Sequence, residues 1–445
     1  SRAQMATLPI LRPRCFYDVA IEVAIIRPGP IVGEMRHPYL NRRSGIEKVD
    51  NIHPLCAPIL ERTLGVILFQ EQILRIAMDV AGFTGAEADE LRRAMGSKRS
   101  QEKMGRVVAK LRRGMAERGV GTEAQDKIVQ SIGAFALYGF PESHAISFGL
   151  IAYASCYLKV HHPAEFYTGL INNQPMGFYS VNSLIQDGKR RGIRFLPVSV
   201  AHSDDRTSVV SDKVVRLGLL HLKGLGRDTA ARIRDERLRC PFASLEDLID
   251  RCQPNQKERR LLAKAGALND LPAVGHRRAG MWQIELPLHH DMLPTESRSD
   301  VLPTMNQAER LAADYTTQGA SAGPHPVLMW RRQHPEMKLP RAVDLIRLPH
   351  GFPVQIAGMA ICRQRPGTAN GHCFISLEDE TGIANLFVPK KTFHAYKLVI
   401  TAESFLLAEG RVQIGEGNQA TVYVTSIRPL PGSDPAVAVR SHDFH

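Results

Sequence analysis

Apolar positions in the first part of the chain repeat with the period of an α-helix. Phe69, Ile73, Ile76 and Val80 are separated by four, three and four positions, and this spacing places them on one face of a helix. Residues 84–87, Thr-Gly-Ala-Glu, have the form of a capping box, in which a hydroxyl and a carboxylate satisfy free N–H groups at a helix start. We therefore predict a mainly helical region over residues 1–200.

The longest apolar run, residues 145–158, is interrupted by Ser147, Tyr153 and Ser155. It is shorter than the roughly 20 residues that a membrane span needs, so we predict a buried helix and no membrane partner. The start of the chain does not have the form of a secretory signal. The seven cysteines are scattered and show no close pair suited to zinc. These features predict a cytoplasmic protein.

A glycine-rich turn marks a second unit near residue 216. Residues 222–226, Leu-Lys-Gly-Leu-Gly, precede a helical segment over 228–239, and further helices are expected over 242–251 and 261–268. This pattern is typical of a helix-hairpin-helix module, whose glycines let backbone N–H groups approach a DNA phosphate. Lys223, Gly224 and Gly226 are therefore candidate DNA contacts, and a plain turn is the alternative.

The pattern changes twice more towards the end of the chain. From about residue 270 to 345 the sequence is rich in Pro, His, Met and Ser with little periodicity, which predicts a linker or an irregular domain edge. After residue 352 the period becomes two, and the order strand, acidic turn, strand, helix, strand, strand fits an OB-type barrel. Arg363, Arg365 and Phe374 are its candidate single-strand contacts. With few aromatic residues present, an interaction or spacer barrel is almost equally plausible.

These segments together predict a multidomain α+β protein. The expected order is a mainly helical region, a helix-hairpin-helix module, a linker or irregular segment, a C-terminal OB-type β-barrel and a tail. The boundaries that we predict are 1–200, 201–272, 273–345, 346–430 and 431–445.

The charge of the chain favours an anionic partner. Lys and Arg number 57 against 45 Asp and Glu, which leaves a formal charge of +12. Arg92, Arg93 and Lys98 gather at the predicted end of the helix that starts near residue 85. Arg presents a planar fork that suits phosphate oxygens, and Lys supplies a compact charge. The alternative is that these cations only favour a helix C-terminus.

A basic stripe continues from this cluster. Arg106, Lys110 and Arg113 fall on one helical face with few acidic residues between them. A solvated helix usually mixes both signs of charge, so a one-sided stripe favours a polyanion such as DNA.

In their order along the chain, these motifs resemble the C-terminal part of bacterial C-family DNA polymerases of the polymerase III alpha-subunit type. The resemblance covers essentially the whole chain and rests on residues 15–18 leading to 27–30, and on 65–72, 91–96 and 143–144. Two details are similar to the error-prone branch: Pro141-Glu142 stands before Ser143, and residues 175–180 read Pro-Met-Gly-Phe-Tyr-Ser.

The resemblance implies specific roles for the residues of the helical region. Residues 1–200 would form the polymerase fingers, and Arg92 and Arg93 would contact the triphosphate of the incoming nucleotide. The secondary contacts to the nucleotide would be Arg27, Lys98, Ser143 and His144. The implied partners are a DNA primer-template, deoxynucleoside triphosphates and a sliding clamp reached through a companion protein.

The resemblance also implies what this chain lacks. Phosphoryl transfer needs metal ions and clustered carboxylates, and in the family the Mg²⁺-binding aspartates lie in a palm that precedes the position of Ser1. We therefore expect no catalytic residue and no metal site in this chain, and no activity of the chain alone. Asp204-Asp205 and the turn Glu378-Asp379-Glu380 are expected to be solvated surface groups.

Two other functional hypotheses remain at this stage. One is a non-catalytic nucleic-acid-binding protein or subunit derived from a polymerase. The other is an OB-containing RNA-binding or synthetase appendage, which leaves Arg92, Arg93 and the helical half unexplained.

Overall fold

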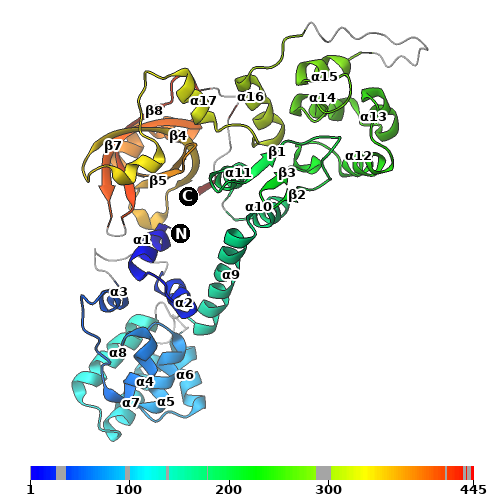
Figure 1. The fold of residues 1–445 in the computed structure, drawn as a ribbon. Coiled ribbons are helices and arrows are strands. Elements are labelled where there is room, and N and C mark those ends of the chain that lie inside the picture. The colour runs from blue at the N-terminus through cyan, green and yellow to red at the C-terminus, as the bar shows by residue number, and fades with distance from the viewer. Residues whose placement is uncertain are drawn as a thin grey trace. The chain divides into compact units, whose positions relative to one another are not determined.

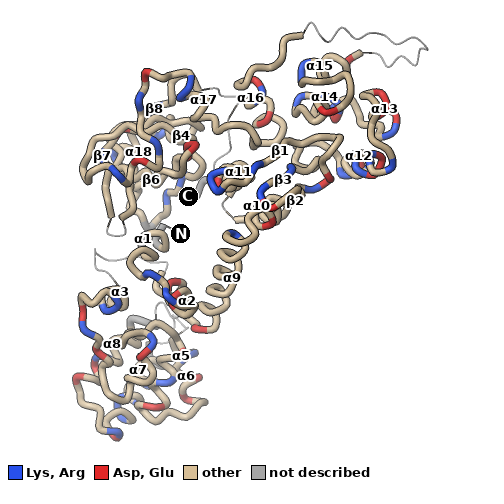
Figure 2. Tube along the Cα trace, viewed as in Figure 1, with Lys and Arg blue, Asp and Glu red and all other residues tan. Residues whose placement is uncertain are grey.

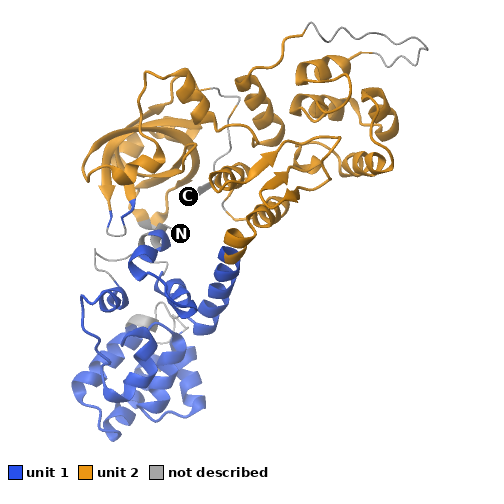
Figure 3. Ribbon diagram, in the orientation of Figure 1, with its two compact units in different colours: residues 1–156, 415–419 blue, residues 157–414, 420–445 orange. Residues whose placement is uncertain are grey.

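A computed structural model of the chain forms two compact units. Unit 1 comprises Ser1–Cys156 with Gly415–Gln419, and unit 2 comprises Tyr157–Ile414 with Ala420–His445 (Figure 3). Unit 1 is helical, and unit 2 combines helices with two sheets (Figure 1). The structure describes residues 2–26, 37–95, 101–136, 140–177, 179–286, 302–415, 418–433, 437 and 442–444.

Unit 1 has two apolar cores. The helices α1 to α3 enclose one of them, and α4 to α8 enclose the other. The elements of this unit are α1 (Arg2–Leu11), α2 (Phe16–Ile25), α3 (Pro38–Arg43), η1 (Pro54–Cys56), α4 (Ala57–Leu60), η2 (Glu61–Thr63), α5 (Gln70–Asp79), α6 (Gly85–Met95), α7 (Gln101–Glu117), α8 (Thr122–Ala136) and the first part of α9 (Glu142–His161).

The helices predicted at residues 73 and 85 are both confirmed. Ile73, Ile76 and Val80 are fully buried in the second core, as expected for the apolar face of α5. At the start of α6, the Thr84 N–H donates to Glu87 Oε2 at 2.8 Å, and the Glu87 N–H donates to Thr84 Oγ1 at 3.4 Å. This reciprocal pair is the predicted capping box.

Helix α9 corrects the prediction of a buried helix over residues 145–158. Its buried residues are Ala145 and Gly149, whereas Phe148, Ile151 and Tyr153 are 50%, 61% and 56% exposed. The small side chains let α9 approach α2 at Gly149, and the larger ones lie on its other faces. No helix in the described part of the chain is long and apolar enough to cross a membrane.

The first part of unit 2 packs helices around a small sheet. In this sheet β3 lies between β1, which runs parallel to it, and β2, which runs antiparallel. The predicted helices over 228–239 and 242–251 are confirmed as α12 and α13. The elements are α10 (Pro163–Asn172), α11 (Val181–Arg190), β1 (Arg194–Leu196), β2 (Ser208–Ser211), β3 (Val214–Arg216), η3 (Leu219–His221), α12 (Arg227–Arg239), α13 (Leu245–Cys252), α14 (Gln256–Ala265) and α15 (Arg277–Gln283).

The prediction of an irregular segment over 273–345 is wrong for much of its described part. Besides α15, this segment contains α16 (Gln307–Gln318), α17 (Pro326–Gln333) and η5 (Ala342–Arg347). The helices are short, so their apolar periodicity is weak. Side-chain caps start them instead: His276, Asn306 and His325 each accept a hydrogen bond from a backbone N–H of the first turn. The predicted domain boundaries stay predictions.

The C-terminal part of unit 2 contains the predicted OB-type barrel. Its strands pair in the order β5, β6, β8, β7, β4, and β4 pairs again with β5, which closes the barrel. Burial alternates along β5 and β6, as the period-two pattern predicts. The elements are β4 (Pro353–Gln364), η6 (Gly367–Ala369), β5 (Cys373–Glu378), β6 (Ile383–Val388), α18 (Lys390–Ala395), α19 (Lys397–Ala402), β7 (Phe405–Ile414), β8 (Ala420–Pro429) and β9 (His442–Phe444).

Buried carboxylates tie the barrel to neighbouring helices of unit 2. Glu378 is fully buried, and its Oε1 accepts hydrogen bonds from Arg190 Nη1 and Nη2 of α11 at 3.1 and 3.0 Å. Asp379, 1% exposed, accepts the backbone N–H of Ala342 at 2.8 Å and lies 3.4 Å from Arg331 Nη2 of α17. The prediction that residues 378–380 are solvated is therefore wrong, because arginines from two helices compensate these charges in the interior.

Candidate nucleic-acid interface

Arg92 and Arg93 lie in the last turn of α6 and share one carboxylate. Arg92 Nη2 is 2.8 Å from Asp89 Oδ1, and Arg93 Nη2 is 2.6 Å from Asp89 Oδ2. The hydrogen bond from Arg92 lowers the pKa of Asp89. The arginine side chains are 48% and 76% exposed, and exposed ion pairs contribute little to stability. Both guanidinium groups are therefore accessible to an anionic ligand that can replace Asp89.

The basic stripe on α7 is only partly one-sided in the folded chain. Arg106 and Arg113 are exposed and have no ion pair within the described residues. Lys110, by contrast, binds the Glu87 carboxylate of α6 and lowers its pKa, a partner that sequence spacing along one helix does not reveal. Acidic and basic residues alternate over the helices of unit 1 (Figure 2). The stripe that faces solvent thus consists mainly of its two arginines.

The start of α9 presents Ser143 and His144 to solvent, next to acidic side chains. The side chains of Ser143 and His144 are exposed. The first N–H of the helix, that of Glu142, donates to Glu71 Oε2 at 2.8 Å, and Tyr17 Oη donates to Glu142 Oε1 at 2.5 Å. These carboxylates oppose the attraction of the helix N-terminus for an anion. The other two predicted nucleotide contacts, Arg27 and Lys98, lie outside the described residues.

The predicted hairpin of the helix-hairpin-helix module has the expected backbone shape. Gly224 adopts a φ of +104°, which glycine tolerates and other residues avoid. The side chain of Lys223 and the backbone of Gly224 are exposed. However, the Gly226 N–H donates to Glu258 Oε1 at 2.9 Å, so it is not available to a phosphate. This contact corrects the prediction for Gly226, and Lys223 and Gly224 stay predictions.

On the barrel, one of the three predicted contacts is not at the surface. Arg363 is 9% exposed, and its Nη2 donates to the Glu403 carbonyl at 2.5 Å, so the prediction that it contacts a single strand is wrong. Arg363 lies in β4 and is buried, whereas Arg365, just after the strand, is partly exposed. The sequence alone did not distinguish the two arginines. Arg365 stacks on Phe393, with its guanidinium carbon 4.5 Å from the ring centroid.

An aromatic row crosses the outer face of the barrel around Phe374. The centroid of Phe387 lies 5.5 Å from those of Phe374 and Tyr423 and 5.0 Å from that of His372. Phe374 faces Phe387 across β5 and β6, and Phe387 faces Tyr423 across β6 and β8. We call His372, Phe374, Phe387 and Tyr423 the aromatic row. Three of its members, His372, Phe387 and Tyr423, were not predicted from the sequence. Phe387 and Tyr423 do occupy outward positions in the period-two pattern of their strands.

The described carboxylates do not form a catalytic metal site. No group of three or more His, Cys, Asp or Glu side chains that could hold a metal ion occurs in the described part of the chain. Asp204 and Asp205 each lie 3.1 Å from an arginine, Arg237 and Arg234 respectively. Both carboxylates are therefore engaged in ion pairs with arginines. The residues that the structure describes therefore do not fit the metal ions that phosphoryl transfer requires.

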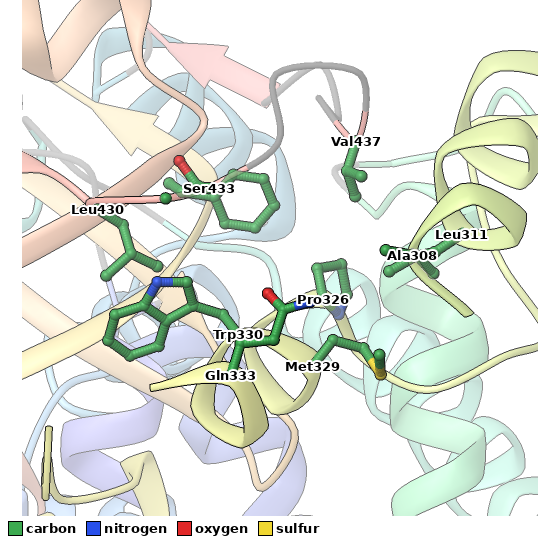
Figure 4. A pocket seen from close by; sticks show the side chains of 11 residues that line it. Ala308, Leu311, Pro326, Met329, Trp330, Gln333, Leu430, Ser433 and Val437 are labelled. Atoms are coloured by element: carbon green, nitrogen blue, oxygen red, sulfur yellow. The ribbon is translucent and has the colours of Figure 1, made fainter. Parts of the chain in front are cut away.

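A separate apolar pocket of about 60 Å³ lies between α16, α17 and the barrel within unit 2. Its wall is mainly hydrocarbon, with Trp330, Met329 and Leu430 around the space and Gln333 and Ser433 as its polar members (Figure 4). The volume is far below the 300–1,000 Å³ typical of small-molecule sites. It is therefore too small for a nucleotide.

Three family models match successive parts of the chain. Residues 1–119 match "Bacterial DNA polymerase III alpha subunit finger domain". Residues 192–280 match "Helix-hairpin-helix motif", and residues 354–430 match "OB-fold nucleic acid binding domain". Among solved structures, asparaginyl-tRNA synthetase from Pyrococcus horikoshii matches 21% of this chain and 23% of that chain at 21% identity. Its TM-score of 0.19 is too low to support an argument.

Curated relatives match the chain from end to end. The proteins named error-prone DNA polymerase from Anaeromyxobacter dehalogenans (strain 2CP-C) and Alkalilimnicola ehrlichii are both 43% identical over 100% of this chain, which corresponds to 40% and 44% of their own lengths. The protein of that name from Corynebacterium glutamicum is 42% identical over 97% of this chain and 41% of its own. The chain thus spans about two fifths of the length of these relatives.

Proposed function

Because the chain belongs to the bacterial DNA polymerase III alpha-subunit-like family, whose error-prone members it matches from end to end, we propose that it supplies nucleotide and DNA contacts to an error-prone, DNA-directed DNA polymerase. The observation that carries the proposal is the match over the whole chain, with finger, hairpin and barrel segments in one order. Damage-tolerant synthesis, a cytoplasmic location and a sliding clamp reached through a companion protein belong to the same proposal.

Arg92 and Arg93 are the proposed grip on the triphosphate. Both guanidinium groups are exposed and share a single carboxylate, and a planar donor fork suits phosphate oxygens. Arg27, Lys98, Ser143 and His144 remain proposed secondary contacts to the nucleotide, as the family resemblance implies.

A variant of the intact polymerase tests this assignment. Replacing Arg92 and Arg93 with Ala should raise the KM for deoxynucleoside triphosphates at least tenfold, because each charge-assisted contact to phosphate is lost. The Kd for primer-template DNA should change less than threefold. The matched variant, Arg106→Ala with Arg113→Ala, removes the same charge from α7 and should weaken DNA binding instead. Equal losses of nucleotide use and DNA binding in the first variant would refute the triphosphate assignment.

Catalysis is proposed to require carboxylates from a part of the relatives that this chain does not cover. Magnesium ions held there would stabilise the charge that develops on the phosphates during transfer, and the described residues offer no such cluster. The isolated chain should therefore bind primer-template DNA with a strong dependence on salt and extend no primer. Extension by the pure chain that depends on Mg²⁺ would contradict this part of the proposal.

The aromatic row is the proposed contact to single-stranded template. OB-type barrels bind oligonucleotides on the face of their second and third strands, which are β5 and β6 here. Stacking of a base on an aromatic ring contributes about 1–3 kcal/mol. Phe387→Ala should therefore weaken binding of a single-stranded oligonucleotide by at least fivefold. Phe352, 44% exposed at the start of the barrel, provides a control that should leave affinity unchanged when replaced by Ala.

A further inference from the structure

A cleft in unit 1 collects three arginines between the end of α1 and the end of α3. Its volume is about 340 Å³, at the lower end of the range for small-molecule sites. None of the described residues that line it is acidic. The lining residues are Pro9, Ile10, Leu11, Arg12, Arg14, Arg43 and Ser44.

Arg43 builds the cleft and has no donor left for a ligand. A guanidinium has five N–H donors, and the five acceptors of Arg43 lie within its own unit. Its Nε donates to the Leu11 carbonyl at 2.7 Å, and its Nη2 donates to the Arg12 carbonyl at 3.2 Å. The others are both Asp18 carboxylate oxygens, at 2.8 and 2.7 Å, and Tyr39 Oη at 3.2 Å. Arg43 therefore fixes the backbone that carries Arg12, and Asp18 neutralises its charge.

Arg12 and Arg14 have guanidinium donors without a partner in the part of the chain that the structure describes. Both residues are exposed. Among the described residues, the one side-chain hydrogen bond of Arg12 is from Nε to the Pro9 carbonyl at 3.3 Å. The Arg14 backbone N–H donates to Asp18 at 2.6 Å, but its guanidinium has no partner within the residues that the structure describes. Two arginines whose guanidinium donors are not all used by described residues thus line one cleft.

The backbone of Arg12 gives independent support to a role for its side chain. Arg12 has a φ of +46° and ends α1, where its N–H donates to the Leu8 carbonyl at 2.9 Å. Helices that end in this left-handed conformation usually have glycine there, because other residues are strained. An arginine at this position keeps a charged fork in the cleft in spite of the strain.

We propose that the cleft formed by Arg12, Arg14 and Ser44 binds a phosphate group. Two forks and one exposed hydroxyl match the oxygens of a phosphate, and their two positive charges match its negative charge. The phosphate belongs either to a DNA strand or to a free polyphosphate such as that of a nucleotide. The site is separate from Arg92 and Arg93 in sequence, and it does not rest on the proposed polymerase function.

Binding by the purified chain tests the site with two probes, inorganic tripolyphosphate and a single-stranded DNA oligonucleotide. Because Arg92 and Arg93 are a second candidate site for this probe, both are first replaced by Ala; in that background, adding Arg12→Gly with Arg14→Gln should lower the affinity for tripolyphosphate at least tenfold. If the phosphate is that of a strand, the slope of log Kd for DNA against log salt should instead fall by about one for each arginine removed. Arg75→Gln, an exposed arginine of α5 outside the cleft, is the control and should change neither quantity.

The substitution Arg12→Gly should not impair folding, because glycine adopts a φ of +46° without strain. The thermal midpoint of the variant should be equal to or higher than that of the wild-type chain. A second readout needs no further variant: the probe that binds the cleft should protect Arg12 and Arg14, but not Arg75, from an arginine-specific reagent, as measured by mass spectrometry. Effects with tripolyphosphate alone identify a free polyphosphate, and effects with DNA alone identify a strand. If neither probe responds in either readout, the proposal is overturned.

Discussion

Arginine–carboxylate pairs occur in two different settings in this molecule. On α6 of unit 1, Arg92 and Arg93 share Asp89, and each of these side chains is at least 37% exposed. In unit 2, Arg190 pairs with Glu378, and their side chains are 19% and 0% exposed. The chemical groups are the same, but the first set lies in water and the second lies in the protein interior.

The difference separates arginines that can bind a ligand from arginines that hold the fold. An exposed pair contributes little to stability, so a phosphate can replace its carboxylate at little cost. Removing one partner of a buried pair costs about 3–5 kcal/mol, so the arginine is committed to the protein. The same distinction applies within the cleft of unit 1. There Arg43 uses all its donors within the protein, whereas Arg12 and Arg14 have donors that can bind a ligand.

The largest expected effect comes from breaking the buried pair. Glu378→Ala leaves Arg190 without its carboxylate, and it should lower the free energy of unfolding by about 3–5 kcal/mol, measured by urea denaturation. The double variant Arg190→Met with Glu378→Met removes both charges and should recover most of this loss. A loss below about 1 kcal/mol in the single variant would mean that the interior pair behaves like a surface pair.

The sequence predicted the architecture well, because the architecture follows from periodicity. The apolar spacing around Ile73, the capping box at Thr84 and the alternation along β5 and β6 are local patterns, and the structure confirms each of them. The failures concern partners that are distant in sequence. Glu378 was expected in solvent because its partner, Arg190, is 188 positions away.

The second largest effect concerns a buried carboxylate that has no arginine. Glu22 of α2 is 4% exposed, and neither of its carboxylate oxygens has a hydrogen-bond partner among the described residues. Burial raises its pKa to about 7. Its unfolded pKa is near 4.5, so the folded state binds more protons between these values. The stability that Glu22 contributes is therefore complete below about pH 4.5 and is lost as pH rises through 7.

Glu22→Gln should remove this pH dependence. The variant should match the wild-type chain near pH 5 and be more stable at pH 8 by up to about 3 kcal/mol, as urea midpoints across this range would show. Glu61→Gln, at an exposed position, is the control and should follow the wild-type curve. If the difference in stability between Glu22→Gln and wild type stays constant from pH 5 to 8, the pKa of Glu22 is not raised in the folded protein.

The candidate interface was less predictable than the fold, and exposure is the reason. Charge counting in sequence treated Arg363 and Arg365 alike, but the side chain of Arg363 turns into the protein and donates to the Glu403 carbonyl. The small number of aromatic residues also made a nucleic-acid-binding role of the barrel look weaker than it is. Pairing across strands gathers Phe374, Phe387 and Tyr423 into one row. Both outcomes depend on how the strands pair, and the register between strands cannot be read from one sequence by inspection.

The smallest expected change in stability tests the exposed pair directly. Asp89→Asn frees Arg92 and Arg93 and should leave the urea midpoint of unfolding nearly unchanged, because exposed ion pairs contribute little to stability. Binding of inorganic tripolyphosphate at low salt should tighten severalfold, because the phosphate no longer competes with a carboxylate. This gain should disappear when Arg92 and Arg93 are also replaced by Ala, and it should persist when Arg12 and Arg14 are replaced instead. Weaker binding by Asp89→Asn would show that Asp89 orients the two arginines for a ligand. The exposed arginines would then resemble Arg190, whose position is also held by a carboxylate.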